Sequence, residues 1–126
     1  MSKARDIWER QANEDDLEAA RAYLSMVLDA RAVSKAIAAF RKCKPVMLEA
    51  KDVLRASNLP LVDEDEPKVA KDIKKIKKKE KLSPVLLIRG DALAGAPMTI
   101  ADGYHRICAS FCTDKKEPVA CCLISL

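Results

Sequence analysis

The sequence predicts an α+β protein with a small mixed sheet of about four short strands flanked by helices. Apolar residues recur at helical spacing through the first 44 residues, and short apolar runs bounded by turn residues recur after residue 83. With 126 residues, the chain has the length of a single domain. We therefore expect one domain over 1–126, with a helical N-terminal region over 1–44 and an α+β core over 45–126.

The N-terminal region is expected to be helical. Asn13 is a suitable N-cap, and the three acidic residues that follow it favour the positive end of a helix. A second helix begins near Ala32 and ends before Pro45, so the region is either one bent helix or a helical hairpin. We expect it to pack against the sheet, with pairing of two copies as the alternative. The residues before it are expected to dock through Ile7 and Trp8.

The elements of the core follow from apolar runs and the residues that punctuate them. A strand is expected over 45–48 and a short helix over 50–56. Pro67 is favoured in a first helical turn and starts a lysine-rich helix that reaches about Lys79. The remaining order is a buried strand over 84–88, a turn over 89–96, a strand over 98–101, a helix over 104–113 and a strand over 119–124.

Composition excludes several classes of protein. Apolar residues make up 49% of the chain and charged residues 33%, which is not the composition of a disordered chain. No apolar run approaches the roughly 18 residues that span a bilayer, and Met1–Arg10 lacks the apolar segment of a signal peptide. We therefore expect a cytoplasmic location and no membrane partner. In that compartment the five cysteines are expected to be reduced thiols.

Two adjacent cysteines lie in the last expected strand. Successive residues of a strand point to opposite faces of the sheet, so at most one of Cys121 and Cys122 should face the core.

Lysines are concentrated in one segment although the net charge of the chain is only +4. The segment Lys71–Lys81 holds seven lysines and two acidic residues. It is either a solvated helix face or a face that meets phosphate, including that of DNA. Aromatic residues are only 4% of the chain, so a base-stacking platform for single-stranded nucleic acid is poorly supplied. DNA binding by this helix alone would rest on phosphate contacts without base readout.

The segment with the clearest chemical character is the turn between the strand over 98–101 and the helix over 104–113. Gly103 lets the backbone turn sharply after Asp102, and His105 and Arg106 then lie in the first helical turn. Cations there oppose the helix dipole, and a bound anion explains their presence. Asp102 could hold Mg²⁺ or act as a base. The alternative is an ordinary strand-to-helix turn with a capping Asp.

The same residues resemble a known family. Asp-Gly-Tyr-His-Arg-x-x-Ala at 102–109 is similar to the signature of the ParB/sulfiredoxin superfamily, in which a glycine, an arginine and a small residue follow at these intervals. The helix around 69–76 and the turn and strand over 82–88 resemble the elements that precede this signature. The resemblance covers about 67–124 and is nearest to the ParB-like nuclease-type and free-serine-kinase-like branches.

This resemblance implies a site for a nucleotide or another phosphorylated small molecule, often with Mg²⁺. It implies phosphate contacts from Gly103, Tyr104, His105 and Arg106, joined by Lys81 and Ser83 from the preceding turn. Asp102 would be the metal ligand, and Asp102 and His105 would be the catalytic residues of a phosphoryl transfer or phosphodiester hydrolysis. The alternatives are a non-catalytic binding or regulatory module, and a small DNA-associated protein that uses Lys71–Lys81. Sulfiredoxins carry their reactive cysteine where this chain has Tyr104, which argues against sulfiredoxin activity.

A zinc site is a competing interpretation of the same helix. His105, Cys108 and Cys112 share one helical face, and Cys121 or Cys122 could complete a ligand set. Zinc sites usually contain a Cys-x-x-Cys knuckle, which this sequence lacks, and buried cysteines on an apolar helix face are much commoner. We therefore expect no zinc.

Overall fold

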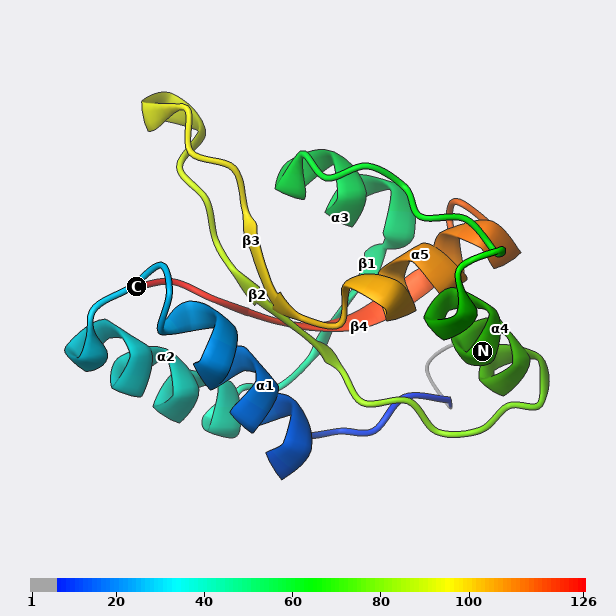
Figure 1. The fold of residues 1–126 in the computed structure, drawn as a ribbon, viewed down its shortest axis with the longest axis horizontal. Helices are drawn as coiled ribbons and strands as arrows, with labels where there is room; N and C mark the ends of the chain where they lie inside the picture. Colours follow the sequence, from blue (N-terminus) through cyan, green and yellow to red (C-terminus); the bar gives the residue numbers. More distant parts are fainter. Residues whose placement is uncertain (1–6) are drawn as a thin grey trace.

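A mixed sheet of four strands forms the middle layer of the protein, as a computed structural model of residues 7–126 shows (Figure 1). The strands are β1 (Val46–Glu49), β2 (Val85–Ile88), β3 (Thr99–Asp102) and β4 (Pro118–Ile124), and their order in the sheet is β1-β4-β2-β3. β4 runs antiparallel to β1 and parallel to β2, while β3 runs antiparallel to β2. The predicted α+β class with a small mixed sheet is confirmed. Residues 1–6 of the predicted domain lie outside the described residues.

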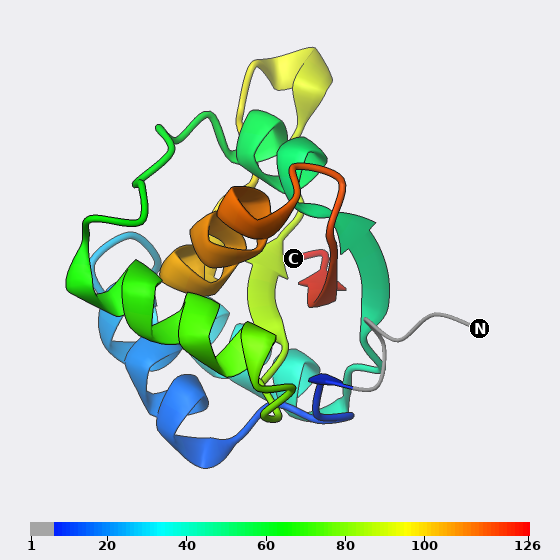
Figure 2. The same cartoon turned by 90° about the vertical axis from the view of Figure 1, so that its right-hand side faces the viewer.

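Helices cover both faces of this sheet (Figures 1 and 2). One face carries α1 (Glu14–Leu24) and α2 (Ala30–Lys42), and the other carries α3 (Ala50–Ser57), α4 (Pro67–Lys77) and α5 (Tyr104–Thr113). A short 3-10 turn, η2 (Ala92–Ala94), lies at the end of the β2–β3 hairpin. In the part of the chain that the structure describes, no helix has both the length and the apolar character to cross a membrane.

The ends of the N-terminal helices follow local capping. The side chain of Asn13 accepts a hydrogen bond from the Asp16 amide and starts α1, as the sequence predicts. Asp29 accepts from the Ala32 amide and starts α2 two residues before the expected position. The N-terminal region is therefore a helical hairpin and not one bent helix.

The last turn of α4 is shorter than expected. The helix ends at Lys77, and Lys79 has a φ of 57°, in the left-handed region that terminates helices.

The sheet buries side chains on both of its faces. Cys121 packs into the cluster under α3, α4 and α5, Cys122 packs into the cluster under α1 and α2, and both are 0% exposed. The prediction that at most one of the two could face the core is therefore wrong. It fails because helices cover both faces, so each side of β4 meets a core of its own.

The segment before α1 docks on the protein through Ile7 and Trp8, as expected. Both side chains are buried, and Trp8 forms an isolated parallel bridge with Leu82. The Leu82 amide donates to the Ile7 carbonyl at 2.7 Å, and the Glu9 amide donates to the Leu82 carbonyl at 2.7 Å. This pairing fixes the chain just before β2, next to the turn that the sequence analysis singles out.

Candidate functional site

Gly103 forms the turn between β3 and α5 in a conformation that favours glycine. Its φ is 104°, and a Cβ atom built there would lie 2.5 Å from Cγ1 of Val85 in β2. The space that a side chain would need at Gly103 is therefore occupied by Val85 of β2. β2 and the turn pack directly against each other, which sets the position at which α5 begins.

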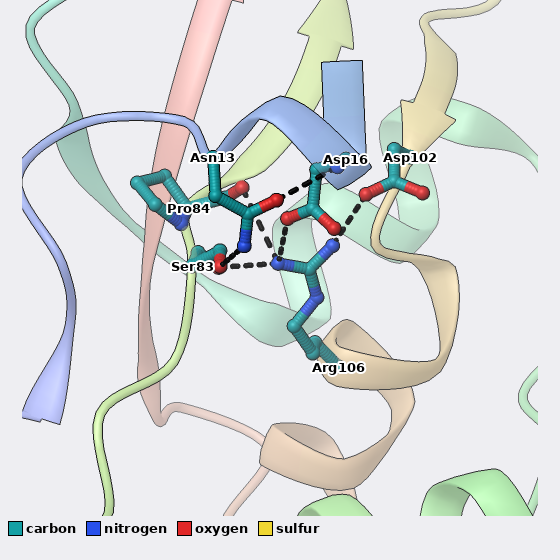
Figure 3. Close-up of polar contacts among 6 residues, drawn as sticks. All are labelled: Asn13, Asp16, Ser83, Pro84, Asp102 and Arg106. Carbon is teal, nitrogen blue, oxygen red and sulfur yellow. Dashed lines mark hydrogen bonds and ion pairs between the residues drawn. The ribbon is translucent and has the colours of Figure 1, made fainter. Parts of the chain in front are cut away.

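Arg106 is the centre of a polar network that connects four parts of the chain (Figure 3). Its Nη1 donates to Oδ2 of Asp16 at 3.0 Å and to the Ser83 carbonyl at 2.6 Å, and its Nη2 donates to Oδ2 of Asp102 at 2.6 Å. The side chain is only 12% exposed. Arg106, expected to contact phosphate, thus uses its guanidinium to join α1, the segment before β2, the end of β3 and α5.

Asp102 is a carboxyl group with an altered acidity. Burial raises its pKa to about 6, the nearby Asp16 carboxylate adds to the increase, and the Arg106 guanidinium opposes it. A carboxyl group with a pKa in this range can take up and release a proton near neutral pH, which is a property of general acids and bases.

A cavity of about 280 Å³ lies beside the start of α5. The helices α4 and α5 run side by side, and the cavity is bordered by residues of both (Figure 2). Its lining contains three lysines, one arginine, one histidine and two acidic side chains, and consists of Lys68, Lys71, Asp72, Lys75, Asp102, Gly103, Tyr104, His105 and Arg106. No side chain caps the N-terminus of α5, so its first amides lack a capping partner at the place where the cavity lies.

The other predicted site residues divide into two groups. His105 borders the cavity, with Nε2 at 3.5 Å from Oε2 of Glu66. Tyr104 also borders it, and its hydroxyl donates to the Pro60 carbonyl. Lys81 and Ser83 do not line the cavity. Of the predicted site residues, Asp102–Arg106 thus border the cavity, whereas Lys81 and Ser83 do not.

Ser83 and Glu66 have structural partners near the site. The Ser83 hydroxyl accepts a hydrogen bond of 2.6 Å from Nδ2 of Asn13, the residue that caps α1. The Glu66 carboxylate accepts from the Lys68 and Val69 amides at the start of α4, which lowers its pKa. These contacts connect the start of α1 to the segment before β2, and the start of α4 to His105 at the start of α5.

The prediction of a phosphate-facing segment at Lys71–Lys81 did not single out which of its residues border the cavity, and it left out Lys68. Lys68, Lys71 and Lys75, with Asp72, lie on one face of that helix and form one wall of the cavity. Burial raises the pKa of Asp72, against the effect of the nearby Arg106. The available signal was the spacing of these residues, which separates a cavity face from the exposed Lys74, Lys77 and Lys78.

The side chains near the cavity decide whether the expected Mg²⁺ ion could be held there. Within residues 7–126, no three side chains of His, Cys, Asp or Glu are grouped so that they could hold a metal ion. Mg²⁺ commonly binds one or two carboxylates and takes its other ligands from water and substrate phosphates. Asp72 and Asp102 both border the cavity, so the residues present fit an Mg²⁺ ion that arrives with a phosphorylated ligand.

Comparisons of the chain with known protein families, with curated proteins and with solved structures find no match.

Proposed function

We propose that this protein binds the phosphate of a nucleotide or of another phosphorylated small molecule in the cavity between α4 and α5. The observation that carries the proposal is the uncapped start of α5 beside a wall formed by Lys68, Lys71 and Lys75. Amides at a helix start attract anions, and lysines add charge to the same place. The likeness of 102–109 to the ParB/sulfiredoxin signature supports the same assignment.

The proposal gives the residues of the turn different roles. The amides of the first turn of α5, the three cavity lysines and His105 bind phosphate. Arg106 is a positioning residue, because its guanidinium already donates to Asp16, Asp102 and a backbone carbonyl. Lys81 and Ser83 act through the turn before β2 and do not meet the phosphate, since neither borders the cavity.

Catalysis by this site would be phosphoryl transfer or phosphodiester hydrolysis. Asp102 would accept the proton of the attacking water or hydroxyl group, which its raised pKa favours. The attacking oxygen would bond to phosphorus as the bond from phosphorus to the leaving oxygen breaks, and the leaving group would depart with the electron pair of that bond. His105 would donate to a phosphate oxygen. Mg²⁺, held by Asp72 and by phosphate oxygens of the ligand, would neutralise phosphate charge and leave the Asp102 carboxylate available as the base. A protein that binds the nucleotide without turning it over is a binding or regulatory module, and a hydrolysis assay on the identified nucleotide separates the two.

The proposal is tested by a thermal-shift panel of ATP, ADP, CTP, GTP and inorganic phosphate, each with and without Mg²⁺. A ligand that binds only the folded state adds about 2.7 kcal/mol of stability at a hundred times its Kd, so a clear rise in Tm is expected for at least one ligand. The double variant Lys71→Gln/Lys75→Gln should lose that rise, because both side chains border the cavity.

A matched control lies on the same helix. Lys74→Gln/Lys78→Gln removes the same charge from exposed positions that do not border the cavity, and it should keep the full shift. An equal loss in both double variants would mean that only the general charge of α4 matters. A panel without any shift would refute phosphate binding.

The exposed lysines of α4 favour DNA binding as a second candidate function. Lys74, Lys77 and Lys78 face solvent outside the cavity. Contacts to DNA phosphates should weaken steeply as salt concentration rises. For DNA binding, Lys74→Gln/Lys78→Gln is the test variant and Lys71→Gln/Lys75→Gln is the control. The first should weaken DNA binding more than the second does. DNA affinity that is absent, or insensitive to salt, would exclude this candidate.

A further inference from the structure

A second, larger cavity lies between α3 and the β2–β3 hairpin and has no part in the proposed function. Its volume is about 630 Å³, and no residue of its lining is shared with the cavity between α4 and α5. This volume is within the range of about 300–1,000 Å³ that is usual for small-molecule sites. The cavity is therefore large enough for an organic ligand of moderate size.

The walls of this cavity come from three parts of the fold. One wall is α3 and the other is the β2–β3 hairpin, which lies next to α3 in Figure 1. The Met98 amide donates to the Ala56 carbonyl at 2.9 Å and ties the two walls together. The half-buried side chains of Leu48 and Leu123 add apolar surface from β1 and β4.

The charged residues at this cavity leave one cation without an acidic partner. The Asp52 carboxylate pairs with two cations. Its Oδ1 atom lies 3.1 Å from Nζ of Lys51 and 3.6 Å from Nη1 of Arg55. Arg89 donates from Nε to the Ser125 hydroxyl at 3.1 Å and forms no ion pair with any described residue. A guanidinium with free donors beside an apolar cavity matches a ligand that has a hydrocarbon body and a carboxylate.

We propose that this cavity binds a small amphipathic carboxylic acid, whose apolar part lies against Leu48, Met98 and Leu123 and whose carboxylate pairs with Arg89. The apolar part gains from removal from water, and the charge-assisted hydrogen bonds to the guanidinium select the acid over a neutral analogue. The site is independent of the proposed phosphate site, so either proposal can fail without the other.

The test uses 4-phenylbutyrate as the probe and 4-phenylbutanol as its neutral analogue, with NMR titration of the whole chain. Saturable shifts are expected for the methyl groups of Leu48, Met98 and Leu123, at lower concentrations of the acid than of the alcohol. Arg89→Gln should weaken binding of the acid about tenfold and leave binding of the alcohol unchanged. Arg31→Gln, a change of the same kind at an exposed position of α2, should alter neither.

A filling variant gives a second, independent reading. Ala56→Phe places a ring at the wall of the cavity and should abolish the shifts for both probes, whereas Ala38→Phe on the exposed surface of α2 should not. Equal binding of acid and alcohol, or equal binding to Arg89→Gln, would overturn carboxylate recognition. Methyl shifts that depend on protein concentration without any probe would also overturn it, because the exposed Leu93 of a second copy would then be the occupant.

Discussion

The Arg106 side chain fixes the turn between β3 and α5 through its contacts with other parts of the chain. Its guanidinium is nearly buried between Asp16 and Asp102, and it also donates a hydrogen bond to the Ser83 carbonyl. Removing the cation would leave two carboxylates close to each other in a poorly solvated place. The position of the α5 start therefore depends on an interaction that involves α1, which lies ninety positions earlier in the chain.

We expect Arg106→Ala to lower the free energy of unfolding by about 3 kcal/mol, because it leaves uncompensated buried charge. Arg106→Lys should restore only part of this loss, since an ammonium group cannot reproduce the fork that spans both carboxylates. Urea unfolding at neutral pH measures both variants. A stability of Arg106→Ala equal to that of the parent would show that the network contributes little, and lost ligand binding in that variant would then indicate direct contact.

Asp102 should make the stability depend on pH in an unusual direction. Its pKa is raised to about 6 from an ordinary value of 3.8, so the folded protein binds a proton more tightly than the unfolded chain between these values. The contribution of Asp102 to stability therefore increases as the pH falls through 6 and decreases as it rises. One unit of pKa difference between the folded and the unfolded state corresponds to roughly 1.4 kcal/mol of stability, so the effect is large enough to measure.

Comparison with Asp102→Asn isolates this effect, because the variant cannot titrate at that position. The stability of the parent relative to the variant should rise between pH 7 and pH 4.5 in urea unfolding. The carboxyl carbon of Asp102 should also titrate near pH 6 by NMR. Asp15→Asn, on the exposed side of α1, serves as the control. A relative stability that falls on acidification would show that Asp102 is stabilised as the anion.

Gly103→Ala should destabilise the protein by about 1–3 kcal/mol. The backbone there has a positive φ, and the added methyl group would press on Val85. Thermal unfolding measures the loss. Gly95→Ala is the matched control, since Gly95 also has a positive φ of 74° but has open space around its Cβ position. Equal losses in the two variants would mean that backbone conformation alone, and not the contact with β2, accounts for the effect.

Among the elements, β4 carries the largest share of the core. It pairs with β1 on one side and with β2 on the other, and its residues Val119–Cys122 are all buried. Burial raises the pKa of Cys121 to about 12 and that of Cys122 still further, so both thiols stay protonated in the folded protein. These cysteines act as apolar side chains and not as nucleophiles.

Cys121→Ser and Cys122→Ser should each lower the free energy of unfolding by about 1–3 kcal/mol, because each places a hydroxyl group in an apolar cluster. Similar losses are expected, since the two residues belong to the two separate clusters of the core. Chemical denaturation of both variants measures them, with Cys112→Ser at a half-buried position of α5 as the control. A loss at only one of the two positions would show that one face of β4 is not tightly packed.

The elements were largely predictable because their signals are local. Each of these signals lies within a few residues of the element that it marks. They are the N-cap Asn13, the proline at the start of α4 and the glycine before α5. The burial of both Cys121 and Cys122 was not predictable in this way. Which strand lies in the middle of the sheet, and whether both of its faces are covered, depends on contacts between distant segments.

At the scale of the whole molecule, the candidate site was predicted only in part. The turn over 102–106 was found because glycine and the cations of a first helical turn stand next to one another in the sequence. The wall of lysines from α4 and the partners of Arg106 come from other elements, so their places depend on how these elements pack. Sequence patterns locate a turn well, but they do not show which side chains of other elements face it.

The position of β4 also has a consequence for how the chain is made. This central strand, Pro118–Ile124, is synthesised after β1, β2 and β3, yet both β1 and β2 pair with it. A ribosome-bound chain that has not released these residues can form the β2–β3 hairpin and the helices that precede β4. The edges of β1 and β2 that pair with β4 then have no partner. Completion of the sheet must then be a late event that depends on contacts between distant residues, which is typical of slower folding.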